Sequence, residues 1–102
     1  MKKYSELELM DLIGELELWG YNHLKPLFEG KHDTSHQMYK AKSKLYDLMV
    51  KYKVTPDYIY NSMTIWEEVN GFHDRVAQVS FNDKSEIPRA IIMCILKSKN
   101  II

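Results

Sequence analysis

The feature that most constrains the fold is a pair of helix-like patterns within residues 34–69. Apolar residues recur there at spacings of three and four, which is typical of one buried helix face. The recurring residues are Met38, Ala41, Leu45, Leu48 and Tyr52 in the first pattern, and Ile59, Met63, Trp66 and Val69 in the second. Between the patterns, Thr55 suits an N-cap, Pro56 a first helical position and Asp57 an acidic first turn. The sequence therefore predicts helices over residues 34–53 and 56–70.

Three further helices complete an expected all-α fold. Ser5 and Glu8 form a capping box that begins a helix over residues 5–24. Residues 72–81 fit either a helix or a short extended piece, and we favour a helix. The last helix, over residues 86–98, is apolar nearly all round and should lie at the centre of the molecule. Together these patterns predict one all-α domain, a compact bundle or array of four to five short helices.

Composition limits the classes of function. The chain has 102 residues, and its fourteen basic and fourteen acidic residues cancel, so net charge favours neither nucleic acid nor a membrane surface. The single Cys94 excludes an internal disulfide and fits a reducing cytoplasm. We see neither a secretory signal nor an apolar run long enough to span a membrane. An excess of lysine over arginine is typical of the AT-rich genomes of many phages and mobile elements. We therefore expect a cytoplasmic protein.

The first helix carries a second apolar stripe, which a peripheral helix of a small bundle would not need. Its residues are Leu7, Met10, Gly14, Leu18 and Tyr21. Stable monomers seldom leave such a stripe open, so we expect it to bind a partner protein or a second copy, most simply in a two-fold dimer. Tyr39 and Tyr46 on a lateral face of the 34–53 helix extend this partner-binding prediction, because tyrosine is frequent at interface hot spots. The alternative is that a five-helix array covers these stripes within one chain.

Residues 45–68 also resemble a helix-turn-helix, which suggests DNA binding as an alternative function. The second helix would present Tyr60 and Asn61 to the bases. The lysines that would contact phosphate stand on the helix before it: Lys42, Lys44, Lys51 and Lys53. An ordinary helical hairpin explains the same spacing.

Two His-Asp dipeptides resemble the pair for which a family of all-α metal-dependent phosphohydrolases is named. The dipeptides, and the residues that could nominally complete a metal site, are His32-Asp33, His73-Asp74, His23, His36 and Asp83. His32 and His36 also stand four residues apart, as two ligands on one helical face would. Two such dipeptides among four histidines arise readily by chance, and 102 residues is short for that fold. We therefore expect no metal, no cofactor and no catalytic residue, and keep the metal-dependent hydrolase as a third interpretation.

Residues 41–54 resemble a segment of an uncharacterised helical domain family of bacterial and phage proteins. The pattern is Ala41-x3-Leu45-x2-Leu48-Met49-x-Lys51-Tyr52-x-Val54. The resemblance implies a helical fold and carries over no activity. The sequence thus favours a small non-catalytic protein-interaction module, an adaptor or inhibitor, with the helix-turn-helix regulator as the alternative.

Overall fold

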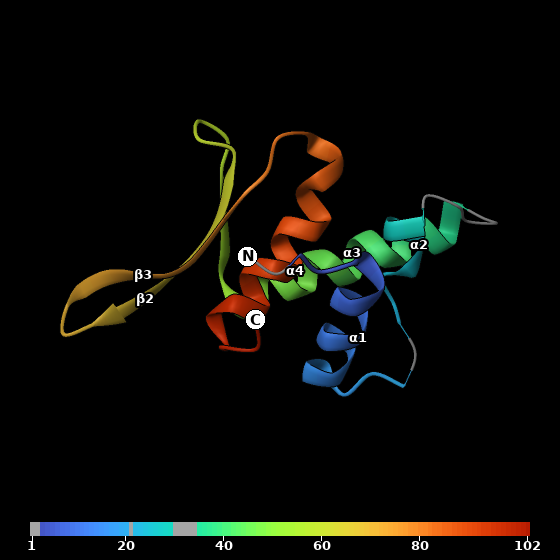
Figure 1. The fold of residues 1–102 in the computed structure, drawn as a ribbon, viewed down its shortest axis with the longest axis horizontal. Coiled ribbons are helices and arrows are strands. Elements are labelled where there is room, and N and C mark those ends of the chain that lie inside the picture. Colours follow the sequence, from blue (N-terminus) through green and yellow to red (C-terminus); the bar gives the residue numbers. More distant parts are fainter. Residues whose placement is uncertain (1–2, 21, 30–34) are drawn as a thin grey trace.

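Four helices and a three-stranded antiparallel sheet make up the described part of this fold (Figure 1). The structure is a computed structural model, and it describes residues 3–20, 22–29 and 35–102. In chain order the elements are α1 (Glu6–Glu17), α2 (Lys25–Glu29), α3 (Ser35–Tyr52), β1 (Val54–Asp57), β2 (Ser62–Val69), β3 (Phe72–Ser80), a 3₁₀ turn (Lys84–Glu86) and α4 (Ile87–Ser98).

The prediction of an all-α bundle is wrong, because residues 56–70 and 72–81 form strands and not helices. The sheet has the order β1-β2-β3, with Val54 opposite Ile65 and Val69 opposite Phe72. The Asn70-Gly71 pair, which we expected to end a helix, joins β2 to β3 with φ of 54° and 81°. Two consecutive positive φ angles are what a tight hairpin turn of type I′ requires, and Asn-Gly is its preferred pair.

The predicted helix start at residues 55–57 belongs to the edge strand β1. Pro56 fits there because an edge strand leaves some N–H positions without a ladder partner. Asp57 does accept backbone hydrogen bonds, from the N–H groups of Ile59 at 3.0 Å and Tyr60 at 3.2 Å, but they close a turn and not a helix. Ile59 is 86% exposed, so its three-and-four spacing with Met63 does not mark a buried face.

The central position predicted for the last helix is confirmed. Figure 1 shows α4 between the sheet and the other helices, and α4 contacts α1, α2, α3 and all three strands. It is apolar nearly all round because neighbours surround it on every side. The buried cluster draws on every layer: Leu9, Ile13, Leu24, Leu45, Leu48, Val54, Met63, Ile65, Ala77, Phe81, Ala90, Ile91, Ile92, Cys94, Ile95 and Leu96. None of the helices that the structure describes combines the length and apolar content needed to cross a membrane.

The helices predicted over residues 34–53 and 86–98 are confirmed as α3 and α4, within one residue at each end. The capping box of the first helix is also confirmed, since the Glu8 N–H donates to Ser5 Oγ at 3.1 Å and the Ser5 N–H to Glu8 Oε1 at 3.2 Å. The first helix nevertheless ends at Glu17 and not near residue 24. Leu18 takes a left-handed conformation with φ of 58°, which ends the helix and turns the chain back.

Candidate functional site

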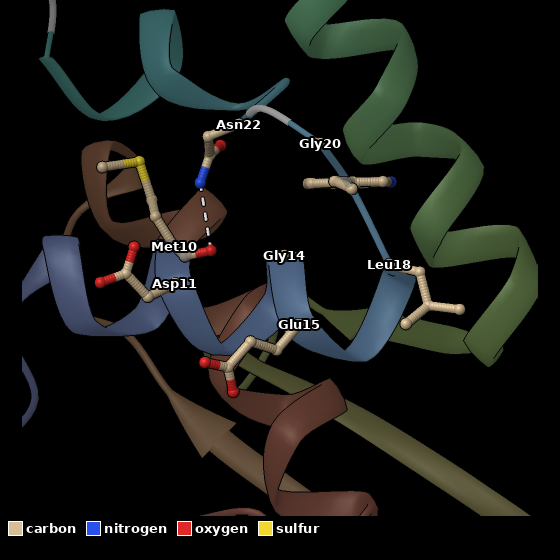
Figure 2. A pocket seen from close by; sticks show the side chains of 8 residues that line it. Met10, Asp11, Gly14, Glu15, Leu18, Gly20 and Asn22 are labelled. Atoms are coloured by element: carbon tan, nitrogen blue, oxygen red, sulfur yellow. Dashed lines mark hydrogen bonds between the residues drawn. The ribbon is translucent and has the colours of Figure 1, made fainter.

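An open cleft of about 630 Å³ lies between α1 and the segment that follows it. Figure 2 shows the residues that line it, which we call the α1 cleft: Met10, Asp11, Gly14, Glu15, Leu18, Trp19, Gly20 and Asn22. The left-handed Leu18 creates this arrangement, because it directs the following residues back along α1 instead of extending the helix. Its backbone N–H donates to Glu15, and the Trp19 N–H donates to the Gly14 carbonyl at 2.9 Å.

Asn22 anchors the far end of this returning segment. Its side-chain Nδ2 donates to the carbonyl oxygen of Met10 at 3.1 Å, as Figure 2 shows, and its Oδ1 accepts from the Leu24 N–H at 2.8 Å. The amide thus satisfies one backbone group on α1 and one at the start of α2. The segment is held over α1 at one end by Trp19 and at the other by Asn22, so hydrogen bonds within the fold fix the shape of the cleft.

Trp19 forms a wall of the cleft and is held by two side chains from outside it. The Lys44 ammonium of α3 lies 5.4 Å from the Trp19 ring centroid, a cation–π distance. The His23 ring meets Trp19 edge-on, with centroids 4.9 Å apart and an interplanar angle of 87°. Burial, and then the nearby Lys44 charge, hold the pKa of His23 below its usual value. A low pKa favours the neutral imidazole beside the indole.

Gly14 lies in the middle of α1 and forms part of the cleft lining. Within the described part of the chain, a Cβ built on Gly14 would meet no neighbouring element within 4 Å, and neither would one built on Gly20. The space above both glycines is therefore open. The cleft is rimmed by the Asp11 and Glu15 carboxylates, which share one side of α1 in Figure 2. Carboxylates, an amide and apolar groups in an open cleft can bind apolar and cationic groups, and this lining presents no nucleophile.

The structure brings together three of the predicted partner-binding residues and separates the others. Met10, Gly14 and Leu18 line the cleft, with Met10 buried and Leu18 90% exposed. Tyr21 lies outside the described residues. Three more lie elsewhere on the surface and are exposed: Leu7 near the start of α1, and Tyr39 and Tyr46 on α3.

Sequence reasoning missed the roles of Trp19 and Asn22 in this site. Both residues fall within the helix predicted over residues 5–24, and neither belongs to the apolar stripe that was assigned to a partner. The role of Asn22 could not be predicted from its neighbours in the sequence. Its hydrogen bond to Met10 joins residues twelve positions apart and forms only once the chain has turned back.

The helix-turn-helix interpretation lacks its recognition helix in this structure. Tyr60 and Asn61 lie in the turn between β1 and β2, and Asn61 has a positive φ of 51°. The four lysines do lie on α3 or just beyond it, but they do not form one surface that could contact phosphate, because their contacts differ. Lys44 approaches Trp19, Lys51 forms an ion pair with Glu17 at 2.7 Å, and Lys42 and Lys53 are exposed.

The residues of the hydrolase interpretation are scattered or fall outside what can be described. His32-Asp33 is outside the described residues, and His73-Asp74 lies on β3 near the hairpin tip. Among residues 3–20, 22–29 and 35–102, no three His, Cys, Asp or Glu side chains are grouped so that they could hold a metal ion. Cys94 is fully buried, and burial raises the pKa of its thiol to about 11.

Comparison with known proteins returned no matching family model, no similar curated protein and no similar solved structure. The resemblance of residues 41–54 to a bacterial and phage helical domain family therefore stays a prediction.

Proposed function

We propose that this chain is a small, non-catalytic protein-interaction module that binds a segment of a partner protein in the α1 cleft. Such a module would act as an adaptor or an inhibitor, by occupying a surface of its partner. The single, fully buried Cys94 supports a reducing compartment such as the cytoplasm for this role.

The observation that carries the proposal is the open space above Gly14. Glycine in a helix interior is about 1 kcal/mol less favourable than alanine. Packing inside a protein can justify that loss when another element comes close, but no other element of the described chain lies within 4 Å of a Gly14 Cβ. A side chain from a partner, lying across the helix at this point, would use the space that glycine leaves.

The lining indicates the chemistry of the partner segment. Met10, Leu18 and Trp19 offer apolar contact, and Trp19 is a residue type that is frequent at interface hot spots. Asp11 and Glu15 are exposed carboxylates, and neither forms an ion pair within the described part of the chain. The best fit is therefore a segment that inserts an apolar side chain over Gly14 and places a lysine or arginine against these carboxylates.

The proposal is tested by affinity capture from the source cell, with quantitative mass spectrometry of the recovered proteins. Glu15→Lys reverses a charge on the rim of the cleft. Asp47→Lys makes the same change at an exposed position on α3 that does not line the cleft, and is the matched control. We expect at least one protein recovered by the wild type and by Asp47→Lys to be lost with Glu15→Lys.

Equal recovery of every captured protein by the wild type and both variants would contradict the proposal, provided that their circular dichroism spectra are the same and so show that the variants are folded. A positive result is then mapped with the purified partner by NMR. The amide signals of the α1 cleft should move on binding, and those of the exposed α3 face should not.

A further inference from the structure

The distal part of the β2–β3 hairpin projects from the body as a two-stranded ribbon (Figure 1). β1 pairs only with residues 62–65 of β2, and a register shift between Ile65 and Trp66 marks the point where the hairpin leaves the body. We call residues 66–75 the arm. Its large apolar side chains are open to solvent, with Trp66 46%, Val69 43% and Phe72 75% exposed. Ribbons of this kind are at best marginally stable in water alone, so an exposed apolar one is expected to have a partner.

One face of the arm combines an apolar tip with an unusual pair of charges. Val69 lies opposite Phe72, and on the same face Glu67 lies directly opposite Asp74. Like charges at directly opposite positions destabilise an antiparallel pair. Neither carboxylate has an ion-pair partner among the described residues. This face would therefore be stabilised by a surface that supplies both apolar area and cations.

The outer face of α3 supplies both. Tyr39, Tyr46 and Val50 recur at helical spacing and are 71%, 66% and 60% exposed. Lys42 and Lys53 border them, are exposed, and have no ion-pair partner in the described chain. We call these five residues the α3 stripe. The two lysines are opposite in charge to the two carboxylates of the arm and equal to them in number.

The arm is also short enough to lie within the length of the α3 stripe. Its four residue pairs are separated by three steps along the strand, about 10 Å at ~3.3 Å per residue. Tyr39 to Val50 spans about 16 Å of helix, at ~1.5 Å per residue. In Figure 1 the arm and α3 extend in opposite directions from the middle of the molecule, along its longest dimension of 47 Å. The arm of one chain therefore points away from its own α3 stripe.

We propose that the arm docks on the α3 stripe of a second copy of this chain, reciprocally, in a two-fold dimer. Two molecules laid antiparallel, side by side, place each arm over the other's α3, so one rotation closes both contacts. Each contact packs Val69 and Phe72 against the two tyrosines and brings Glu67 and Asp74 to the lysines. A two-fold pairing through α1 is disfavoured in comparison, because it would bring the Asp11 and Glu15 carboxylates of the two copies together.

The arm itself argues against a nucleic acid as its partner. It carries three acidic residues and one arginine, so it repels phosphate. A basic apolar protein surface is the complement, and the α3 stripe is such a surface.

A charge-swap experiment tests this dimer by size-exclusion chromatography with light scattering. The wild type is expected at twice the 12.1 kDa of one chain. The arm variant Glu67→Lys/Asp74→Lys and the stripe variant Lys42→Glu/Lys53→Glu should each be monomeric, since like charges then meet in the contact. Mixed in equal amounts, they should form a heterodimer, because every contact between them again joins opposite charges.

The matched control is Asp11→Lys/Glu15→Lys, which makes the same charge change in the α1 cleft and should stay dimeric. Circular dichroism of each variant checks that the fold is kept, as expected for substitutions at exposed positions. A monomeric wild type, a mixture that stays monomeric, or a control that loses the dimer would each overturn the proposal. If the wild type is monomeric and the arm variant also fails to capture a protein that the wild type captures, the arm binds a different partner and the dimer proposal is wrong.

Discussion

The side-chain amide of Asn22 donates to the carbonyl oxygen of Met10 at 3.1 Å, and this hydrogen bond ties the segment after α1 to the middle of that helix. The same side chain accepts from the Leu24 N–H at 2.8 Å. Asn22 therefore joins α1 to the start of α2, and the two bonds together define one end of the α1 cleft. The position of this end of the cleft therefore depends on a single side chain.

Replacing Asn22 with alanine should therefore destabilise the fold. The substitution removes the hydrogen bond to the Met10 carbonyl and leaves the part-buried Leu24 N–H without its partner, and such a loss costs about 1–3 kcal/mol. Urea denaturation measures the change. The control is Asn82→Ala, at an exposed position, which should change the free energy of unfolding by less than about 0.5 kcal/mol. Equal effects of the two substitutions would show that Asn22 does not anchor the segment.

Truncation of Leu48 should be among the more damaging single changes in α3. Leu48 is 2% exposed and belongs to the buried cluster, so Leu48→Ala leaves a cavity and should cost about 2–5 kcal/mol. Leu7→Ala is the same substitution on a side chain that is 66% exposed, and it should cost less than about 1 kcal/mol. Thermal or urea unfolding compares them. A near-neutral Leu48→Ala would mean that the core-facing side of α3 is misplaced.

The hydrogen bond between Tyr52 and Glu17 should make the free energy of unfolding fall at alkaline pH. The Tyr52 hydroxyl donates to Glu17 Oε2 at 2.9 Å, and burial, followed by this hydrogen bond, raises the pKa of Tyr52 above its usual value of 10.0. Because the folded state then holds the proton more tightly than the unfolded state, the stabilisation is fully present below pH 10 and is lost as pH rises through the folded pKa. Tyr52→Phe removes a hydrogen bond to a charged group and should cost about 1.5–3 kcal/mol at neutral pH.

The difference between wild type and Tyr52→Phe should therefore shrink above pH 10. Urea denaturation at neutral pH and at several alkaline pH values measures it, and the comparison cancels the contribution of the other tyrosines. Two stability curves that stay parallel across this range would contradict the assignment.

Cys94 should be inert to thiol reagents in the folded protein. It is fully buried, its Sγ lies 3.4 Å from the Met63 carbonyl oxygen, and burial raises its pKa to about 11, so little thiolate is present at neutral pH. Labelling with a chromogenic disulfide should be slow in native buffer, should follow global unfolding as urea is added, and should reach one thiol per chain in the unfolded state. Complete labelling on mixing in native buffer would contradict this placement.

The long periodic helices were predictable from sequence because their signal is local. The α3 pattern covers five turns, and α4 is apolar nearly all round, so neither depends on long-range information for its identity. The Glu17–Lys51 ion pair at 2.7 Å joins the end of α1 to α3, and no local pattern specifies such a long-range contact.

The sheet was missed because helix caps and tight turns use the same residues. Asp57 accepts backbone N–H bonds in a turn as it would at a helix start, and Asn70-Gly71 takes positive φ in a hairpin as it would at a helix end. The alternation typical of a strand was also hidden, because the arm is exposed on both faces and carries apolar residues on each. The apolar pattern of the arm therefore reflects its exposure in the folded chain and not the burial of one strand face.

The candidate site was predictable only in part. Met10, Gly14 and Leu18 could be found because they share one stripe of a helix. The returning segment could not, since it depends on the left-handed Leu18 and on the long-range hydrogen bond of Asn22.

The most direct test of the α1 cleft is the recovery of partner proteins by Gly14→Leu relative to Gly14→Ala. Both side chains enter open space and favour a helix, so both variants should fold, and Gly14→Ala should gain about 1 kcal/mol in stability. If a partner side chain lies above Gly14, the larger leucine should exclude it, and proteins captured by the wild type should be lost from Gly14→Leu and reduced less with Gly14→Ala. Unchanged recovery by a folded Gly14→Leu would show that the open space above this glycine is not where a partner binds.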